Sequence, residues 1–539
     1  MAALLERFPL AELRRVQGEV WRRLAFHVDG LAALSTWELL HRHGLLARLA
    51  PPGATVGELE QVLIAAGHPR VNPGCLLLAL RSLLNQGWAA TVGPALPQSR
   101  WQLTAAGQSF FAAAGALAQV PRLLAAARAA LGPAGPAAED ALAAALELAA
   151  ADYGLEAAAP ERFRHQLEGP LAASLATTLV ARGWPLEESL PPLPEKGRER
   201  LAGWLAGWLR RQGWTDAAGK PAATAAIVAL LASHYWYPLS YLATLSNLEE
   251  LYFGDPRAFV ARSAEGGERH LDRELDIRFS GRVFAGPIRQ PFLAQVLAVF
   301  SAPRASQPEA VIDIGAGDGS MLRETWSAIA AATAGSEPRG ERPLLAVAVE
   351  PSSAARRRSG ANLRAAALPH VVLEGDIAAP RALAELLTKL GIDPENCLYL
   401  CKSVFHNRPF RPPAAGDRPG LPETTGAFLG GDGESLPGAA VVGSLIELFE
   451  AWRPFWRRHG MVAIEAHTVP AGQAAALQGR SPLTCLELLH GYSQQLLLEP
   501  EVHRAAARAA GLTSLASAAV GVDEVGYTAL TVDHWRARG

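Results

Sequence analysis

An alternation of apolar strands and helical stretches in the C-terminal half limits what this chain can fold into more than any other feature. Short apolar runs rich in Val, Ile and Leu recur beyond about residue 285, and amphipathic stretches separate them. This order is typical of a parallel sheet with crossover helices. We expect an α/β domain over residues 285–539, and two late apolar stretches at 512–522 and 527–532 can close its sheet. The expected parallel strands are 310–314, 344–349, 370–373, 397–401 and 461–464.

A glycine-rich turn follows the first of these strands. Gly315, Gly317 and Gly319 lie between that strand and a helical stretch, so the backbone can turn tightly beneath a ligand. Such a turn also fits dinucleotides, whose pyrophosphate rests on a helix N-terminus. However, Asp313 and Asp318 would repel a pyrophosphate, whereas carboxylates suit a zwitterionic amino acid that bears an adjacent sulfonium.

The next strands also end in acidic residues. Glu350 follows the second strand, where a carboxylate can accept both ribose hydroxyls, and Asp376 with Ile377 follows the third, where they can hold an adenine. Parallel strand ends share one edge of a sheet, so these residues form one predicted crevice. Taken singly, Asp318 and Asp376 fit helix caps equally well. The predicted cofactor-binding residues are Asp313, Gly315, Gly317, Asp318, Glu350, Asp376, Ile377 and Ser403.

This ordered set resembles the class I methyltransferase pattern. The resemblance implies a Rossmann-like sheet and S-adenosylmethionine (SAM) as the cofactor, although the position of the crevice alone would also allow NAD.

Histidines and a carboxylate are predicted on the acceptor side of the crevice. His406 follows the fourth strand, and Glu465 and His467 end the fifth. Histidine titrates near neutrality, so either imidazole is a candidate general base, or else a rim residue that orients the acceptor. His490 and Gln494 are four residues apart and would share a face if the segment is helical. They can hold a divalent metal with open positions, or they can serve packing.

Charge and cysteine usage exclude several classes of partner and compartment. The chain has 52 acidic and 50 basic residues, a formal charge of −2, so no general field attracts nucleic acid or an anionic membrane. Its four cysteines form no C-x-x-C pair, which argues against a disulfide framework and suits a reducing cytoplasm. The N-terminus mixes charge and proline into its apolar residues, and later apolar runs such as 225–232 are too short to cross a bilayer. We therefore expect a cytoplasmic, unexported protein.

The length of 539 residues indicates roughly three domains of about 100–200 residues each. Residues 1–115 contain a helix-helix-helix-hairpin pattern typical of a winged helix, but segment 73–80 has almost no side chains that read bases, which argues against DNA binding. Residues 116–230 are an Ala-rich helical region, expected to be a spacer or docking surface. Residues 231–284 are an aromatic helical segment placed to form a lid, and 411–438 are predicted to be a flexible insertion.

Two family resemblances extend this interpretation. Residues 30–112 followed by the sheet domain resemble small-molecule O-methyltransferases, whose winged-helix domain dimerises and whose base is a histidine after the fourth strand. Residues 230–500 resemble more closely the C-methyltransferase domains of polyketide synthase loading modules, through segments 270–277, 280–281, 403–410, 465–468 and 490–494 in that order. The chain departs from that pattern at 282–285 and in its 411–438 insertion.

The resemblance implies SAM-dependent C-methylation of an activated acyl group on a carrier protein, with His406 or His467 as the base and residues 231–281 as a lid. Some members carry one catalytic metal, iron or manganese, and the resemblance would place it on His490 and Gln494. Two alternatives remain. One is O-methylation of a free small-molecule hydroxyl by a homodimer. The other is a SAM-binding regulatory protein, against which the grouping of His406, Glu465 and His467 on one rim argues.

Overall fold

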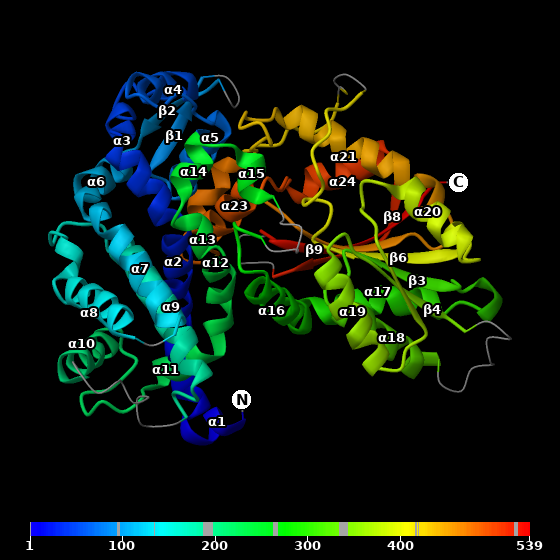
Figure 1. Ribbon diagram of the computed structural model, residues 1–539, viewed down its shortest axis with the longest axis horizontal. Helices are drawn as coiled ribbons and strands as arrows, with labels where there is room; N and C mark the ends of the chain where they lie inside the picture. Colours follow the sequence, from blue (N-terminus) through cyan, green and yellow to red (C-terminus); the bar gives the residue numbers. More distant parts are fainter. Residues whose placement is uncertain are drawn as a thin grey trace.

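The computed structural model describes residues 2–93, 98–133, 135–186, 198–261, 268–333, 343–414, 418, 420–521 and 527–538. Figure 1 shows two halves, a helical one formed by the N-terminal part of the chain and one built on a sheet by the C-terminal part. Helix α23 (Leu483–Tyr492), although late in the sequence, packs in the core of the helical half against α2 (Leu10–Arg42) and α5 (Pro73–Asn85). The two halves are therefore joined by a shared core as well as by the chain.

The first part of the chain has the predicted hairpin after a run of helices, but five helices precede it where the sequence predicts three, and Leu10–Arg42 is one long helix of 33 residues. Thr55 accepts a hydrogen bond from the Glu58 amide, and the Glu58 side chain accepts one from the Thr55 amide, which together begin α4. Strands β1 and β2 pair antiparallel after α5. The winged-helix assignment stays a prediction. The elements are α1 (Ala2–Arg7), α2, α3 (Leu45–Arg48), α4 (Val56–Ala65), α5, β1 (Ala89–Val92), β2 (Arg100–Leu103) and α6 (Ala105–Ala113).

Two long helices cross at very close range in the helical half. A Cβ atom on Gly30 of α2 would lie 2.2 Å from the carbonyl oxygen of Gln166, and one on Gly169 of α9 would lie 2.4 Å from that of His27. Any larger residue at either glycine would push the helices apart. The helices of this region are α7 (Val120–Leu131), α8 (Pro136–Ala150), α9 (Glu161–Ala181), α10 (Arg198–Arg211) and α11 (Ala223–Leu231).

A run of short helices leads from the helical half to the sheet. Asp272 caps α16 by accepting hydrogen bonds from the amides of Glu274 and Leu275. Helix α16 continues through a kinked π-type turn at Phe284–Ile288, which contains Pro287, into α17. The elements are α12 (Trp236–Ser240), α13 (Leu242–Leu245), α14 (Leu248–Phe253), α15 (Pro256–Val260), α16 (Arg273–Val283) and α17 (Arg289–Phe300).

The C-terminal half is built on a sheet of order β5-β4-β3-β6-β7-β9-β8. Only β9 runs antiparallel, between β7 and β8. This confirms the predicted α/β class, because each expected parallel strand forms within a residue or two of its predicted bounds, while the late stretch 527–532 corresponds to a strand that runs over Leu530–Ala537. The strands are β3 (Ala310–Ile314), β4 (Leu345–Val349), β5 (His370–Leu373), β6 (Cys397–Lys402), β7 (Met461–Ala466), β8 (Leu512–Val520) and β9 (Leu530–Ala537).

Helices cover both faces of this sheet. Alternate residues of β3 point to opposite faces, so Val311 packs with α17 and α18 while Ile312 packs with α20, α21 and α24. Both faces of the central strands are thereby buried, as their continuous apolar sequence requires. The remaining helices are α18 (Ser320–Thr333), α19 (Ser353–Ala365), α20 (Pro380–Lys389), α21 (Gly438–Trp452), α22 (Ala471–Ala474) and α24 (Pro500–Ala509).

Segment 411–438 differs from the flexible surface insertion that its composition predicts. In its described part, Phe428 and Leu429 are both only 1% exposed. The carbonyl of Gly433 accepts a hydrogen bond from the amide of Gly74, and the Thr425 amide donates to Glu499. These partners lie far away in the sequence, so the described part of the segment is ordered by contacts of both its buried apolar residues and its backbone with distant parts of the molecule.

Two stretches of described helix are long and apolar enough to cross a membrane, Ala105–Leu131 and Arg273–Phe300. The sequence analysis expects every apolar run to be too short to cross a bilayer, and the length of these two stretches contradicts that expectation. The most apolar windows of these stretches are 50% and 39% buried inside the protein. Core helices pass the same test of length and composition, so the finding is weak evidence for a membrane span.

Candidate active site

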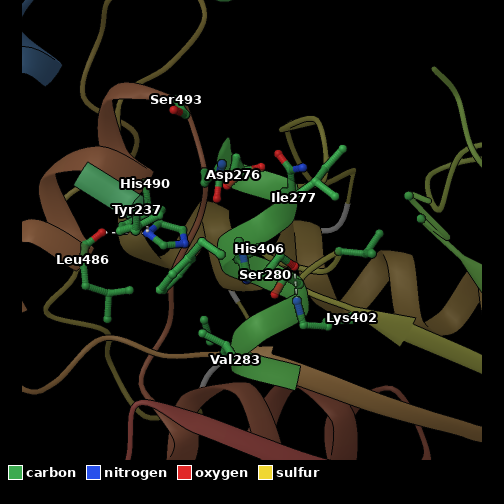
Figure 2. Close-up of a pocket in the computed structure, with 18 of the residues that line it drawn as sticks. Tyr237, Asp276, Ile277, Ser280, Val283, Lys402, His406, Leu486, His490 and Ser493 are labelled. Carbon is green, nitrogen blue, oxygen red and sulfur yellow. Dashed lines mark hydrogen bonds between the residues drawn. The ribbon is translucent and has the colours of Figure 1, made fainter. Parts of the chain in front are cut away.

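A cavity of about 1740 Å³ lies at the carboxyl ends of the parallel strands. Its walls include the glycine-rich turn, α16 and the end of α23, and the helical half adds Trp21 and Val28 from α2. Figure 2 shows α16 crossing the cavity, with Lys402 at the end of the neighbouring strand, and the rings of His406 and His490 lie side by side with centroids 5.1 Å apart. Pockets for one small ligand measure about 300–1,000 Å³, so this cavity has room for a cofactor and an acceptor together.

The glycine-rich turn forms a cradle that side chains would fill. Gly315, Gly317 and Gly319 have φ angles of +73°, +55° and +77°, which residues other than glycine rarely adopt. A Cβ atom on Gly315 would also lie 2.7 Å from a methyl carbon of Val404. The amide of Gly317 donates to Glu350, which fixes the turn against the end of β4. These glycines are thus required by the backbone path, and Gly315 and Gly317 line the cavity.

Asp313 is completely buried beside this turn, and neither carboxylate oxygen has a hydrogen-bond partner among the described residues. Burial raises the pKa of Asp313, and the neighbouring Glu350 raises it further. A buried acceptor without a donor is costly, and a ligand with a cationic amino group would supply the missing donor. The predicted zwitterionic cofactor therefore fits this position.

Glu350 and Asp376 lie at the next two strand ends and line the same cavity. Glu350 accepts hydrogen bonds from the amides of Gly317 and Ser352, at 3.1 and 3.0 Å, which orient its carboxylate. Asp376 is exposed and accepts from the Ala378 amide, while Ile377 beside it is buried. An oriented carboxylate next to an acid and an apolar residue suits a ribose and an adenine, as the sequence predicts.

Asp318 and Ser403 also line the cavity. Asp318 accepts a hydrogen bond from the Ser320 amide at the start of α18, so it serves as a helix cap. Ser403 has a φ of +57°, and its amide donates to the carbonyl of Ile464. That bond continues the pairing of β6 with β7 for one residue and aims the following loop into the cavity.

His406 and Glu465 form a buried pair on the acceptor side. The Nδ1 atom of His406 lies 2.5 Å from Oε1 of Glu465, and the His406 amide donates to the same oxygen. Burial raises the pKa of Glu465, but the attraction of His406 outweighs it, and the pKa is lowered to about 2. A carboxylate can only accept, so Nδ1 of His406 donates to Glu465, and Nε2 is the ring nitrogen that Glu465 does not engage. His406 lines the cavity and is equipped as a general base.

His467 has different surroundings, although it lies only two residues beyond Glu465. Its Nδ1 is hydrogen-bonded to the carbonyl of Leu498, and its Nε2 to the hydroxyl of Thr531. Burial, together with the nearby His503, lowers the pKa of His467 to about 3. Both ring nitrogens are engaged within the protein, and the residue is not in the described lining of the cavity. The structure therefore brings His406 to the cavity with Glu465 buried behind it, and neither Glu465 nor His467 belongs to the described lining.

His490 and Gln494 both line the cavity but do not share a helical face. Helix α23 ends at Tyr492, and Gln494 has a φ of +58° beyond it. Nδ1 of His490 lies 2.7 Å from both the Leu486 carbonyl and the Tyr237 hydroxyl, and burial lowers the pKa of His490 to about 3. An imidazole and an amide oxygen are two neutral donors, fewer than the three protein ligands of a usual catalytic site. The metal at this pair stays a prediction with an incomplete donor set.

Lys402 is a site residue that the sequence interpretation did not include. It ends β6, lines the cavity and donates to the hydroxyl of Ser280 on α16, as Figure 2 shows. Burial lowers the pKa of Lys402 to about 8, against the attraction of Asp276 and Asp313. The signal in the sequence is a lysine at the carboxyl end of an otherwise apolar strand. A buried cation beside Asp313 can bind the carboxylate of an amino-acid ligand.

Helix α16 covers the site without becoming part of the core. None of the residues Arg273–Val283, all of which are described, is buried. The ring of Phe279 stacks on Tyr237 with centroids 5.2 Å apart, and the guanidinium of Arg278 lies 4.7 Å from the ring centroid of Trp236. The helix thus rests on α12 along one side and faces the cavity with the other. This is the position expected for the predicted lid.

Comparison with known proteins identifies the catalytic part of the chain. Residues 268–533 match the family model of the AprA MT2-like methyltransferase domain. This range contains α16, the whole glycine-rich turn and the pair His406 and Glu465. No curated protein matches the chain.

Solved structures show only distant likeness. The CurJ carbon methyltransferase is 12% identical, with 100% of this chain and 97% of that one covered and a TM-score of 0.36. The DszA carbon methyltransferase is 14% identical, with coverages of 83% and 99% and a TM-score of 0.33. An O-methyltransferase family protein from Burkholderia thailandensis is 14% identical, with coverages of 64% and 96% and a TM-score of 0.31. Scores this low do not choose between carbon and oxygen acceptors. From the matched domain, the glycine-rich cradle and the sheet order, this chain is a class I, SAM-dependent methyltransferase, and its residues 268–533 are similar to the AprA MT2-like domain.

Proposed function

We propose that this enzyme transfers the methyl group of SAM to an activated carbon of an acyl group that is tethered to a carrier protein. The observation that supports it is the His406 and Glu465 pair, which opens onto the cavity that also contains the cofactor cradle. A carbon between two carbonyl groups must lose a proton before it becomes a nucleophile. A neutral imidazole with a free Nε2 is suited to accept that proton.

The reaction balances with this one base. Nε2 of His406 removes the proton from the carbon, the resulting carbanion attacks the methyl group, and the methyl–sulfur bond breaks with its electrons left on sulfur. Glu465 stabilises the imidazolium that forms, because its carboxylate accepts from Nδ1–H. The remaining contribution is alignment in a site that α16 shields from water. SAM, when bound, would supply the electrophilic methyl group.

The size and lining of the cavity agree with a tethered acceptor. It extends from the sheet to α2 in the helical half, which gives room for an extended arm. Arg257 and Arg480 line it as well, and guanidinium groups suit a phosphate on such an arm. We propose accordingly that an acyl carrier protein is the partner.

Intact-protein mass spectrometry tests this function. Carrier protein loaded with malonyl or acetoacetyl groups is incubated with SAM and the enzyme, in separate samples that contain iron, manganese or a chelator. A gain of one or two methyl masses supports C-methylation, and its loss with the chelator supports a metal at His490 and Gln494. The matched control is His406→Ala, which keeps the cofactor cradle.

The alternative is O-methylation of a free small-molecule hydroxyl, and the helix and hairpin order of the N-terminal part favours it, because that order resembles dimeric O-methyltransferases. No mass gain on the carrier protein, with SAM binding intact, would move the assignment to that acceptor. Analytical ultracentrifugation would then test for the homodimer that the resemblance implies.

A further inference from the structure

A cluster of metal-ligating side chains lies outside the active site, where α2 crosses α9. The close approach at Gly30 and Gly169 brings His27 of α2 opposite His165 and Glu168 of α9. One ligand atom from each of the three lies within 4.8 Å of the others. Oε2 of Glu168 is 3.3 Å from Nε2 of His27 and 3.0 Å from Nδ1 of His165.

These spacings are those of ligands around a small ion. Donor atoms that bind zinc tetrahedrally at about 2.0–2.1 Å lie about 3.3–3.4 Å from each other. His27 and Glu168 are buried, and the His165 side chain is 13% exposed. The cluster is thus enclosed on one side and reachable by a water molecule on the other, which suits three protein ligands and one water.

Each ligand is also held by a second residue through the atom that does not face the cluster. Nδ1 of His27 is 2.9 Å from the Tyr235 hydroxyl, and Oε1 of Glu168 accepts from Gln212 at 2.8 Å. Nε2 of His165 lies 3.5 Å from a carboxylate oxygen of Glu161. Metal-binding histidines commonly have such a partner on the other ring nitrogen, because it fixes the tautomer and the ring orientation.

The charges around the cluster permit a cation. Glu168 offers a carboxylate oxygen, and Nε2 of His27 and Nδ1 of His165 both face it, so an ion that binds the three atoms takes the place of these two hydrogen bonds. Arg23 is the opposing charge, with a guanidinium nitrogen 3.7 Å from Oε2 of Glu168. That side chain is 23% exposed and can turn toward solvent when an ion binds.

We propose that Nε2 of His27, Nδ1 of His165 and Oε2 of Glu168 bind one zinc ion, which fixes α2 against α9. The crossing supports the far wall of the cavity, because Trp21 and Val28 of α2 line it and His234 meets Trp21 edge to edge with ring centroids 5.2 Å apart. The site is separate from the methyl-transfer residues, so its occupancy does not depend on the function proposed above.

Zinc analysis of the full-length protein tests the site. The protein is loaded with one equivalent of zinc chloride and dialysed, its metal content is measured, and the dissociation constant is obtained by competition with a chromophoric chelator. We expect about one zinc per chain in the native protein and a loss of affinity of at least 100-fold in Glu168→Gln and His165→Ala. The double variant His490→Ala/Gln494→Ala, which removes the candidate site in the cavity, should keep the zinc.

A milder variant separates metal binding from misfolding. Glu161 is 73% exposed in its side chain, so Glu161→Gln should fold normally and weaken zinc about 10- to 100-fold by releasing His165. Cobalt substitution adds a spectroscopic readout, since tetrahedral cobalt with nitrogen and oxygen ligands absorbs visible light. The proposal is overturned if the native protein retains no more zinc than His165→Ala. It is also overturned if zinc is lost only in the double variant His490→Ala/Gln494→Ala.

Discussion

His406 and Glu465 are 59 positions apart in the sequence, yet Nδ1 of the imidazole lies 2.5 Å from the carboxylate. The parallel pairing of β6 with β7 explains the contact. Lys402 is paired with Ile464, so the residues that follow each strand leave the sheet at the same edge. The pair is therefore a consequence of the sheet register, and the catalytic geometry depends on it.

Replacement of the base tests its role directly. We expect His406→Ala to lower kcat by about 10²- to 10⁴-fold, since that is the usual contribution of a positioned general base. SAM affinity, measured by calorimetry, should stay within about twofold, because the cofactor residues are untouched. The variant His467→Asn serves as the comparison. Both ring nitrogens of His467 form hydrogen bonds within the protein, so this variant should lower thermal stability more than turnover. A large loss of kcat in folded His467→Asn would contradict this assignment.

The cofactor site predicts a specific defect for Glu350. Its carboxylate is oriented by two backbone amides for a diol, and hydrogen bonds to a charged group contribute about 1.5–3 kcal/mol each. We expect Glu350→Gln to weaken SAM binding by about 10- to 100-fold with little change in kcat at saturating SAM. Calorimetry with SAM and with S-adenosylhomocysteine measures it. Unchanged affinity for both ligands would remove Glu350 from the cofactor site.

Much of this site follows from the sequence because its residues are placed by local rules. Apolar runs predict the strands, and the acids that follow them must meet at one edge of a parallel sheet. Asp313, Glu350 and Asp376 are brought together in this way. Asp318 accepts a hydrogen bond from the Ser320 amide and also lines the cavity, so its two predicted roles both stay predictions.

Other features were not predictable because they depend on distant partners. Segment 411–438 is ordered by Gly74 and Glu499, which its own composition does not reveal. His467 looks equivalent to His406 in the sequence, and only Leu498 and Thr531 show that its nitrogens are engaged. The role of Lys402 could not be predicted from its place at a strand end, because its partner Ser280 lies on α16, far away in the sequence.

Lys402 predicts a pH dependence of cofactor binding. With a pKa of about 8, the ammonium is charged below that pH and loses its proton as the pH rises through it. We expect SAM affinity to fall between pH 7 and pH 9 as the ion pair with the SAM carboxylate is lost. The amino group of SAM titrates in a similar range, so the matched variant Lys402→Met isolates the effect. That variant should bind SAM more weakly at pH 7 and show a smaller fall. Equal falls in both proteins would contradict the role of Lys402.

The joint between the two halves predicts a large effect on stability far from the active site. Arg81 of α5 and Glu487 of α23 form a bidentate pair at 2.8 and 3.0 Å, with side chains only 1% and 8% exposed. Arg81 also donates to the carbonyls of Thr425 and Val469, so one guanidinium ties α5 to segment 411–438 and to the loop that follows β7.

We expect Arg81→Met to destabilise the protein by about 3–5 kcal/mol, because it leaves a buried carboxylate without its partner. The double variant Arg81→Met/Glu487→Leu should recover part of this loss, since it removes the stranded charge. Recovery should be incomplete, because Asn85 and Thr468 also donate to Glu487 and would lose their acceptor. Chemical denaturation followed by tryptophan fluorescence measures both changes. A loss below about 1 kcal/mol in Arg81→Met would mean that the halves are held by their shared apolar core alone, through contacts such as those of α23 with α2.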